Sequence, residues 1–533
     1  MSRVLSLLGC LLLLSSSLYG EIRLPKIFGN HAVLQRDKKV AIWGWGEPGE
    51  RVTVSFVGQI KSSRVEQDGS WKVELDEMQA QAVGSDLTVQ GSESDLVTLK
   101  NILVGEVWMA SGQSNMAWRL SRTEGATEEI AIAKFPAIRM YITKLRTAAE
   151  PKEDLEGSWF ETTPENAGEF SAVGYYFAKR LQGELDVPVG IIRTAWGGKP
   201  SQAFTTLEKL STKPEGKELV DYLANQMAAY DAEEEQKKFE ARLAEWEEKV
   251  ATIKAENAAM VEMAKEDPSL EVTKKKAPRK PSPPIVPNLN SKSPAAIYNA
   301  MIHPWVGYGM RGTIWYQGES NRNRAKQYET IFPLLIEDWR ERWGEEFPFY
   351  FVQLANFQEP SKEPGVANPW AELQNAQRLT LSLPKTGMAV INDIGDAKDI
   401  HPQNKKDVGE RLARWALAKD YGRADLVFSG PLYSGSVIEG NQIRVVFDHA
   451  DGLKSRDGES LERFEIAGAD QKWYWAEAVI EGKSVVVSSE EVPEPVAVRY
   501  AWAANPEGAN LVNGEDLPAS LFRTDDWKLS TEK

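Results

Sequence analysis

The chain has 533 residues, a net charge of −15 at pH 7, 42% hydrophobic residues and 18 tryptophans. This length is too great for one hydrophobic core, so we expect several domains. The hydrophobic content excludes a disordered chain. The acidic balance argues against nucleic acids and anionic membranes as main partners, but it is compatible with a neutral, sugar-like ligand.

The first 20 residues are typical of a secretory signal peptide. Arg3 precedes the apolar stretch VLSLLGCLLLL, which is too short to span a bilayer, and SSSLYG supplies small residues for cleavage. Cys10, the only cysteine, lies inside this stretch, so a lipoprotein anchor there is the alternative. Removal of the segment would leave a secreted or periplasmic protein without cysteine and therefore without disulfides. We expect no membrane insertion, because no later segment is apolar enough to span a membrane.

Residues 22–100 have the pattern of a small β-sandwich. KVAIWGWGEPGERVTVSFVG and SWKVELDEM are short alternating runs that are separated by Gly, Pro and Asp turns. The same strand-and-turn pattern returns over residues 425–533, for example in QIRVVFDHADGL and PVAVRYAWAAN. We therefore expect β-rich domains on both sides of the middle of the chain.

Residues 101–424 alternate between apolar runs and helical patterns. Helical patterns such as GYYFAKRLQGEL and YETIFPLLIEDWRERW predict an α/β fold with a doubly wound sheet. Ligands of such sheets bind beyond the carboxyl ends of the strands. The polar segments SGQSN, GGKPSQ, GESN, NFQEP and DIGDAKDIH follow the apolar runs, so we expect the functional site to lie among them. The runs that we interpret as buried parallel strands are 102–111, 187–196, 311–318, 348–355 and 387–394.

A charged segment, 213–292, interrupts the α/β pattern. It begins with a long charged helical pattern of some amphipathic spacing and continues into the basic, proline-rich stretch KKKAPRKPSPPIVPN. We interpret the segment as a solvated helical arm; an arm for oligomerisation or for a partner is the alternative. The basic run is too short to predict nucleic-acid binding, and the oligomeric state does not follow from the sequence.

Ser114, in ASGQSNM, follows the first apolar run of the α/β region. It does not lie in the G-x-S-x-G turn of α/β-hydrolases, because Met116 occupies the position of the second glycine. A hydroxyl nucleophile needs a base, and histidine is the usual one at neutral pH. The residues around Ser114 do not by themselves distinguish between two roles for this serine, part of a polar turn or a catalytic nucleophile.

His401 is the histidine that best fits the role of this base. It follows the last apolar run of the α/β region, and Asp393, Asp396 and Asp399 precede it closely. The other three histidines fit less well, because they precede a strand or lie in the β regions: His31, His303 and His449. No two histidines have ligand spacing, so we expect no metal, and nothing indicates another cofactor.

Several ordered motifs resemble the sialate O-acetylesterase family of SGNH-type carbohydrate esterases. These motifs are GQSNM, WGGKPSQAF, IWYQGESN and DIHPQNKKDVGERLA, and both β regions also resemble the flanking regions of that family. The resemblance covers most of 24–525 except 213–292. It implies a three-layer, flavodoxin-like SGNH domain and removal of O-acetyl groups from carbohydrate through an acyl-serine.

The resemblance also implies roles for residues of this chain. Ser114 would be the nucleophile, and His401 would be the general base and then the general acid. The donors for the oxyanion would come from the Ser114 N–H, a glycine of the WGG turn and polar side chains nearby. The candidates for these donors, beside Ser114 itself, are Gln113, Gly197, Gly198, Gln317 and Asn321.

The carboxylate behind His401 stays open. Many SGNH enzymes place an aspartate three residues before the histidine, but Lys398 occupies that position here. Asp399 lies two residues before His401 and can face the same side in an extended segment, so it ranks first. Glu319 of the QGE block ranks second and Asp396 third; Glu319 could instead bind substrate hydroxyl groups.

Tryptophans near the motifs fit a sugar ligand, because sugar rings stack on aromatic planes. We expect Trp118 and Trp196 to form subsites, whereas Trp108 and Trp315 lie inside strands and favour the core. The substrate stays open between O-acetyl sialic acid, acetylated xylan and another acetylated polysaccharide. Two alternatives differ in class: a non-catalytic glycan-binding protein on an esterase scaffold, and an esterase for short non-sugar esters.

Overall fold

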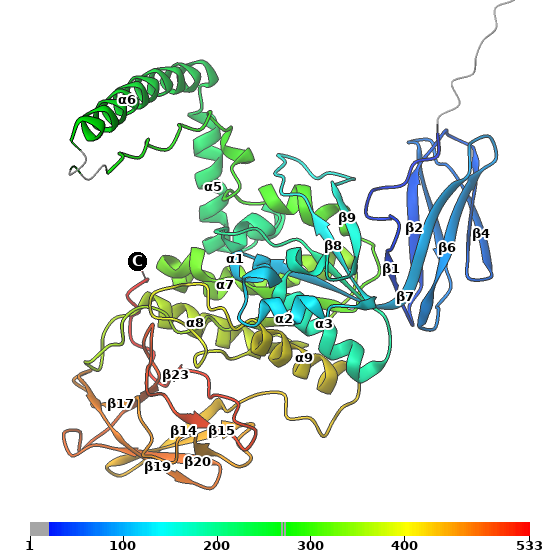
Figure 1. Cartoon of the computed structure of the whole chain (residues 1–533). Coiled ribbons are helices and arrows are strands. Elements are labelled where there is room, and N and C mark those ends of the chain that lie inside the picture. Colours follow the sequence, from blue (N-terminus) through cyan, green and yellow to red (C-terminus); the bar gives the residue numbers. More distant parts are fainter. Residues whose placement is uncertain (1–20, 268–269, 271–272, 533) are drawn as a thin grey trace, which may run out of the picture.

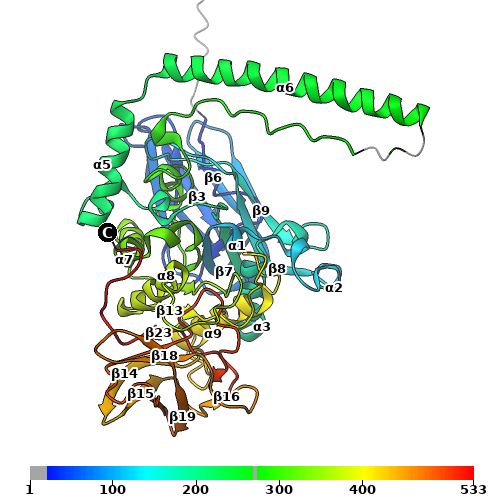
Figure 2. The same ribbon diagram turned by 90° about the vertical axis from the view of Figure 1, so that its left-hand side faces the viewer.

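A computed structural model describes residues 21–267, 270 and 273–532. The signal peptide predicted at 1–20, including Cys10, lies outside these residues. Within the described ranges, no helix is both long and apolar enough to cross a membrane. The chain forms an α/β centre with a β-rich unit on either side and a helical arm (Figures 1 and 2).

The central sheet contains six parallel strands, with a seventh strand, β9, antiparallel at one edge. Five of the six parallel strands correspond to the predicted apolar runs, and the α/β class is confirmed. In spatial order the strands are β13 (Thr386–Ala389), β12 (Phe349–Val352), β11 (Gly312–Tyr316), β7 (Val97–Gly112), β10 (Val189–Arg193), β8 (Phe135–Thr143) and β9 (Gly157–Thr162).

The sequence did not reveal β8 or β9. A buried arginine, Arg139, interrupts the apolar pattern of β8; it is held by Glu161 of β9 and by the Asn101 carbonyl. The five parallel strands that the sequence predicted lie in the order β10-β7-β11-β12-β13, which in chain order is 2-1-3-4-5, the order of flavodoxin-like sheets. β8, with its arginine, adds a sixth parallel strand outside β10, and β9 follows it at the edge.

Helices cover both faces of this sheet. On one face, Trp415 of α9 (Lys406–Asp420) packs against Tyr350, and Phe177 of α3 (Ala172–Leu185) packs against Trp108. On the other face, Trp339 of α7 (Ala325–Trp343) packs against Trp315 and Phe349. The tryptophans Trp108 and Trp315 are thus core residues, as predicted. The remaining short helices of the α/β centre are α1 (Ser114–Ala117), α2 (Ala126–Ala131), α4 (Leu207–Leu210) and α8 (Pro369–Leu379).

The N-terminal β unit shares a strand with the central sheet. The first half of β7 pairs with β6 and β1, and its second half pairs with β10 and β11. The strand therefore runs without a break across the boundary predicted at 100–101. The other strands of the unit are β1 (Val33–Gln35), β2 (Val40–Trp45), β3 (Arg51–Phe56), β4 (Gln59–Arg64), β5 (Ser70–Leu75) and β6 (Gln81–Gly91).

The C-terminal β unit contains two four-stranded sheets, β14-β15-β20-β19 and β18-β17-β21-β23, and a short pair, β16-β22. A separate hydrophobic core, which includes Val445, Val487 and Phe522, lies within it. Its strands are β14 (Leu432–Glu439), β15 (Gln442–Asp448), β16 (Lys454–Ser455), β17 (Phe464–Ala467), β18 (Trp473–Trp475), β19 (Glu477–Glu481), β20 (Ser484–Ser488), β21 (Ala497–Tyr500), β22 (Leu511–Val512) and β23 (Phe522–Arg523).

The segment 213–292 forms the arm. Its first helix, α5 (Pro214–Ala228), buries Leu219 and Leu223, and Leu219 packs with Ile331 and Leu334 of α7. The second, α6 (Ala232–Glu266), projects away from the body and buries no residue (Figure 2). The chain returns along α6, where the Trp246 indole N–H donates to the Pro278 carbonyl at 2.8 Å.

Candidate active site

The carboxyl end of β7 presents Ser114. A Cβ atom at Gly112 would stand 2.2 Å from the Tyr316 carbonyl oxygen of β11, and the φ angle of Gly112 is +127°. Glycine is therefore required where the chain leaves the sheet. Gln113 donates its N–H to the same carbonyl at 2.9 Å, and Ser114 then begins α1. This tight exit from the strand places the serine hydroxyl at the sheet edge without a G-x-S-x-G turn.

His401 approaches Ser114 from the loop between β13 and α9. Its Nε2 atom lies 2.9 Å from Ser114 Oγ, within hydrogen-bond distance. The Trp118 ring lies nearly parallel to the imidazole, with 4.9 Å between centroids and an angle of 16°. The loop is held at its neighbouring residue, because the Ile400 carbonyl accepts from Asn115 Nδ2 at 3.0 Å. The geometry suits transfer of the hydroxyl proton to the imidazole.

Asp399 lies on the far side of the imidazole from Ser114. Its Oδ1 atom lies 3.2 Å from His401 Nδ1 and also accepts the backbone N–H of His401 at 2.9 Å. The Asp399 side chain is 51% exposed and that of His401 is 27% exposed. The three side chains form a serine–histidine–carboxylate series, the arrangement that supports nucleophilic catalysis on several unrelated folds.

The two other predicted carboxylates lie elsewhere. Glu319 is buried and accepts from Asn115 Nδ2 at 2.7 Å. Asp396 is exposed and accepts the backbone N–H groups of Lys398 and Asp399, so it shapes the loop. In the described parts of the chain, neither carboxylate forms a hydrogen bond with His401.

A buried polar network lies behind Ser114, and no pattern in the sequence indicated it. The Asn115 side chain donates to Glu319 and accepts from Lys405 Nζ at 2.9 Å. Lys405 also donates to the Pro402 carbonyl. Burial lowers the pKa of Lys405 to about 7, and burial raises the pKa of Glu319 above its usual range. Lys405 lies in a charged stretch, NKKD, whose composition indicates a solvated helix start, so nothing in it distinguishes the buried lysine from the exposed Lys406.

The WGG turn lies against Ser114. A Cβ atom at Gly197 would stand 3.3 Å from Ser114 Cβ, so the backbone approaches the serine closely there. Gly198 has a φ of +69°, which glycine adopts without strain. The Gln113 side chain accepts from the Ser320 N–H at 3.3 Å. Gln113, Gly197 and Gly198 all line the cavity around Ser114, where the predicted oxyanion donors are needed.

The structure places Gln317 and Asn321 behind the cavity wall. Asn321 Oδ1 accepts from Gln317 Nε2 at 2.7 Å and from the Ser201 N–H at 3.0 Å. Its Nδ2 donates to Gln202 Oε1 at 3.0 Å. Both side chains are buried. They tie the segment after the WGG turn to the QGESN segment, and their polar groups are occupied by these contacts.

The two tryptophans that were expected to form subsites have protein neighbours. Trp118 stacks on His401, donates its indole N–H to the Arg122 carbonyl at 3.1 Å and faces the Arg122 guanidinium. Lys199 Nζ lies 5.1 Å from the centroid of the Trp196 ring. Trp118 therefore supports the imidazole, and neither ring is among the residues that line the cavity.

The cavity at Ser114 has a volume of about 920 Å³. Ser114, His401 and Glu319 lie on one wall, and the base of the arm supplies another wall through α5 and residues 290–294. The sequence did not indicate that the interrupting segment reaches the site. The principal residues that the arm and the QGESN segment contribute are Leu219, Tyr222, Leu223, Lys292, Arg322 and Arg324.

The three other histidines lie away from Ser114. His31 Nδ1 lies 3.0 Å from Asn101 Nδ2, and His303 Nε2 lies 3.6 Å from Glu153. His449 packs against Phe428, and burial lowers its pKa. Over the ranges that the structure describes, no group of three or more His, Cys, Asp or Glu side chains could hold a metal ion.

Comparisons with known proteins agree on the family. The model of the carbohydrate esterase, sialic acid-specific acetylesterase family matches residues 289–418. Sialate O-acetylesterases of Mus musculus and Homo sapiens are each 27% identical, over 91% of this chain and 90% and 88% of those proteins. The crystal structure of a carbohydrate acetylesterase from Xanthomonas citri is 35% identical, with a TM-score of 0.77, and covers 95% of this chain and 100% of that one.

The fold, the serine–histidine site and these similarities define a carbohydrate O-acetylesterase. The chain belongs to the sialate O-acetylesterase family of carbohydrate esterases. The predicted family and enzyme class are confirmed. The comparisons do not favour the two alternatives, a non-catalytic glycan-binding protein and an esterase for non-sugar esters.

Proposed function

We propose that the protein is a secreted serine esterase that removes O-acetyl groups from carbohydrate through an acetyl-serine intermediate on Ser114. The observation that carries this proposal is the series of contacts from Ser114 Oγ to His401 Nε2 and from His401 Nδ1 to Asp399 Oδ1. The predicted secretory signal at 1–20 supports export. We also propose that the α/β centre is an SGNH-type hydrolase domain in which β8 is added outside the flavodoxin-like series of five parallel strands.

In the first half of the reaction, His401 Nε2 takes the proton of Ser114 while Oγ attacks the acetyl carbonyl carbon. The negative charge moves to the carbonyl oxygen, where the backbone N–H groups of Ser114 and Gly197 and the side chain of Gln113 are the proposed donors. His401 returns its proton to the sugar oxygen as the ester bond breaks, and the sugar alcohol leaves.

In the second half, water replaces the sugar. His401 takes a proton from the water, the hydroxide attacks the acetyl-serine, and acetate leaves as Ser114 regains its proton. Asp399 fixes the imidazole tautomer that has its proton on Nδ1 and stabilises the imidazolium that forms twice in the cycle. The exposed position of Asp399 means that water screens part of this effect.

Acetate release from O-acetylated carbohydrate tests this function. Wild-type protein should release acetate, and Ser114→Ala should lower kcat by about 10³-fold or more, as expected when a triad nucleophile is removed. Ser111→Ala is a matched control, because Ser111 lies near the end of β7, just before Ser114, is buried, and forms no side-chain hydrogen bond within the described residues. Equal activity of the Ser114→Ala variant and the wild type would contradict the nucleophile role.

A further inference from the structure

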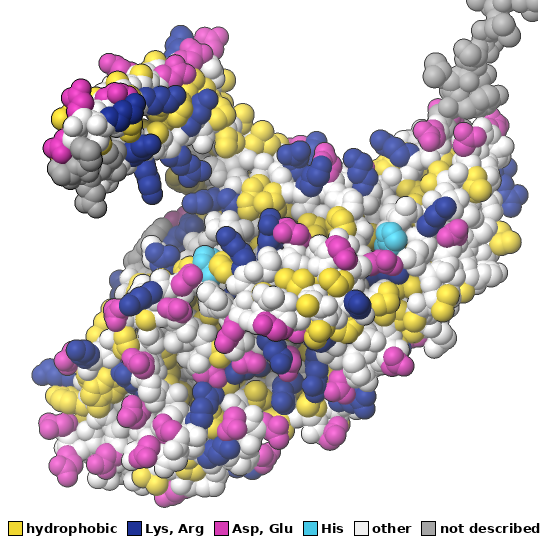
Figure 3. All heavy atoms as spheres, viewed as in Figure 1, with side chains coloured by type: hydrophobic (Ala, Val, Ile, Leu, Met, Phe, Trp, Pro, Cys, Tyr) yellow, Lys and Arg dark blue, Asp and Glu magenta, His cyan; other side chains and the backbone are white. Residues whose placement is uncertain are grey.

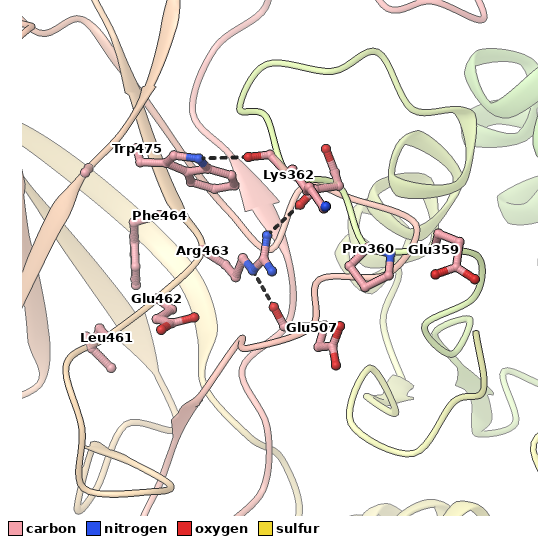
Figure 4. Close-up of a pocket in the computed structure, with 11 residues that line it drawn as sticks. Glu359, Pro360, Lys362, Leu461, Glu462, Arg463, Phe464, Trp475 and Glu507 are labelled. Carbon is pink, nitrogen blue, oxygen red and sulfur yellow. Dashed lines mark hydrogen bonds between the residues drawn. The ribbon is translucent and has the colours of Figure 1, made fainter.

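We propose that a second cavity, between the loop after β12 and the C-terminal β unit, binds neutral sugar units of a polysaccharide chain whose acetylated unit lies at Ser114. This inference rests on the proposed function and narrows its substrate class. The cavity has a volume of about 730 Å³, within the range of small-molecule sites. Figure 4 shows the residues of its walls: 359–362 belong to the loop after β12, and 461–464, 475–476 and Glu507 belong to the β unit.

Trp475 gives the cavity an aromatic surface. Trp475 is the last residue of β18, and 39% of its surface is exposed, which is high for a large hydrophobic residue in a packed β unit. The indole N–H donates to the Lys362 carbonyl at 3.4 Å, and the Arg463 guanidinium lies 5.4 Å from the ring centroid (Figure 4). The ring is thus held in place while part of it faces solvent, which is what stacking of a sugar ring requires.

Arg463 fixes the two walls relative to each other. Its Nη1 donates to the Ser361 carbonyl at 2.8 Å, and its Nε donates to the Glu507 carbonyl. Both acceptors are backbone carbonyls, so these two contacts of Arg463 do not occupy the carboxylates of the cavity. A guanidinium that bridges a loop of the α/β centre and a loop of the β unit gives the cavity a defined shape before any ligand binds.

The charges of the cavity favour a neutral sugar. Glu359, Glu462 and Glu507 are exposed, against the two cations Lys362 and Arg463. Carboxylates accept hydrogen bonds from sugar hydroxyl groups, but they repel the carboxylate of an acidic sugar. The excess of acidic groups therefore argues for neutral units of a polysaccharide rather than a sialylated chain.

A third cavity connects this site to the catalytic loop. It shares Glu359, Pro360 and Glu507 with the Trp475 cavity, and Ala397 and Lys398 also line it. Lys398 is adjacent to Asp399 in the loop that carries His401. The loop is attached to the same wall, because Gln358 donates its N–H to the Ala397 carbonyl at 3.1 Å. A chain bound along this path would approach the loop of His401 from the side of the C-terminal β unit.

The test compares Trp475→Ala with Val479→Ala, a control on β19 of the same β unit whose side chain is 61% exposed. Kinetics are measured with the polymer that the wild type deacetylates fastest among acetylated xylan, mannan and xyloglucan, with xylose tetraacetate, and with 4-nitrophenyl acetate. We expect Trp475→Ala to raise KM for the polymer about tenfold, the loss of one stacking contact. The two small esters and the control variant should be unaffected.

Binding without catalysis separates this inference from the proposed function. In the Ser114→Ala background, affinity electrophoresis through gels containing the three deacetylated polymers should retard the parent, and Trp475→Ala should abolish the retardation. If no acetate is released from any substrate, the proposed function fails. The difference in retardation between the parent and the variant with Trp475→Ala then tests the second cavity by itself. The inference would be overturned if both variants were retarded equally, or if Trp475→Ala impaired the reaction with the polymer and with the small esters to the same extent. Stronger binding of a sialylated glycan than of the neutral polymers would also overturn it.

Discussion

The charged groups near His401 lie in two different environments, one buried and one exposed to solvent. Toward the interior, Asn115 links Glu319 and Lys405, all three of which are buried. Toward solvent, Asp399 lies half in water and contacts the imidazole from within its own loop. The buried side can fix the geometry of the serine because its groups have no water to replace a lost partner, whereas the exposed side supplies charge that water screens.

The largest effect is expected on the buried side. Asn115→Ala removes the group that both Glu319 and Lys405 contact, so two buried ionisable side chains lose a partner. We expect the free energy of unfolding to fall by about 3–6 kcal/mol, because two hydrogen bonds to buried ionisable groups are lost at about 1.5–3 kcal/mol each. Urea denaturation followed by tryptophan fluorescence measures it. A loss below about 1 kcal/mol would show that the network does not hold the site together.

Asp399→Asn tests the exposed side. A charge about 4 Å from the imidazolium contributes from about 1 kcal/mol in water to about 4 kcal/mol near a protein surface. We therefore expect kcat for acetate release to fall about 5- to 1,000-fold, with the free energy of unfolding unchanged. Glu319→Gln, measured in parallel, distinguishes the two carboxylates: a larger loss of kcat for Glu319→Gln at equal stability would make Glu319 the acid of the site.

The pH dependence of stability reports the buried lysine. Lys405 loses its proton near pH 7 in the folded protein and, like an ordinary lysine, near pH 10.5 when unfolded. Between these values the unfolded state binds more protons, so stability rises with pH, by up to about 1.4 kcal/mol per pH unit from this group. Lys405→Met should lack this rise. Lys406→Met, at the exposed neighbour, should retain it, and identical pH profiles for both variants would contradict the assignment.

The smallest effect is expected at Asp396. Its carboxylate accepts two backbone N–H groups of the His401 loop and does not reach the imidazole. Asp396→Ala should cost about 1 kcal/mol, or a few-fold in kcat, because it acts only through the position of Asp399. Steady-state kinetics beside Asp399→Asn provide the comparison. A loss as large as that of Asp399→Asn would mean that the loop, rather than the Asp399 charge, limits the reaction.

The sequence predicted the positions of Ser114 and His401 at strand ends because apolar runs and polar segments alternate clearly there. It missed β8 because Arg139 breaks the apolar run, and only the folded chain brings Glu161 beside that arginine. It also missed Lys405, since burial of a charged residue depends on packing that no local pattern records. The orientations of Asn321 and Trp118 could not be predicted either, because spacing does not say which side of a loop faces a cavity.

The most direct test of the central claim is covalent capture of the nucleophile. Wild-type protein treated with a fluorophosphonate should gain the mass of one adduct, and peptide mapping should place that adduct on Ser114. His401→Ala should slow the labelling strongly, because the imidazole no longer accepts the serine proton. The absence of an adduct, or an adduct on another serine of the same cavity such as Ser320, would contradict the assignment of Ser114 as the nucleophile.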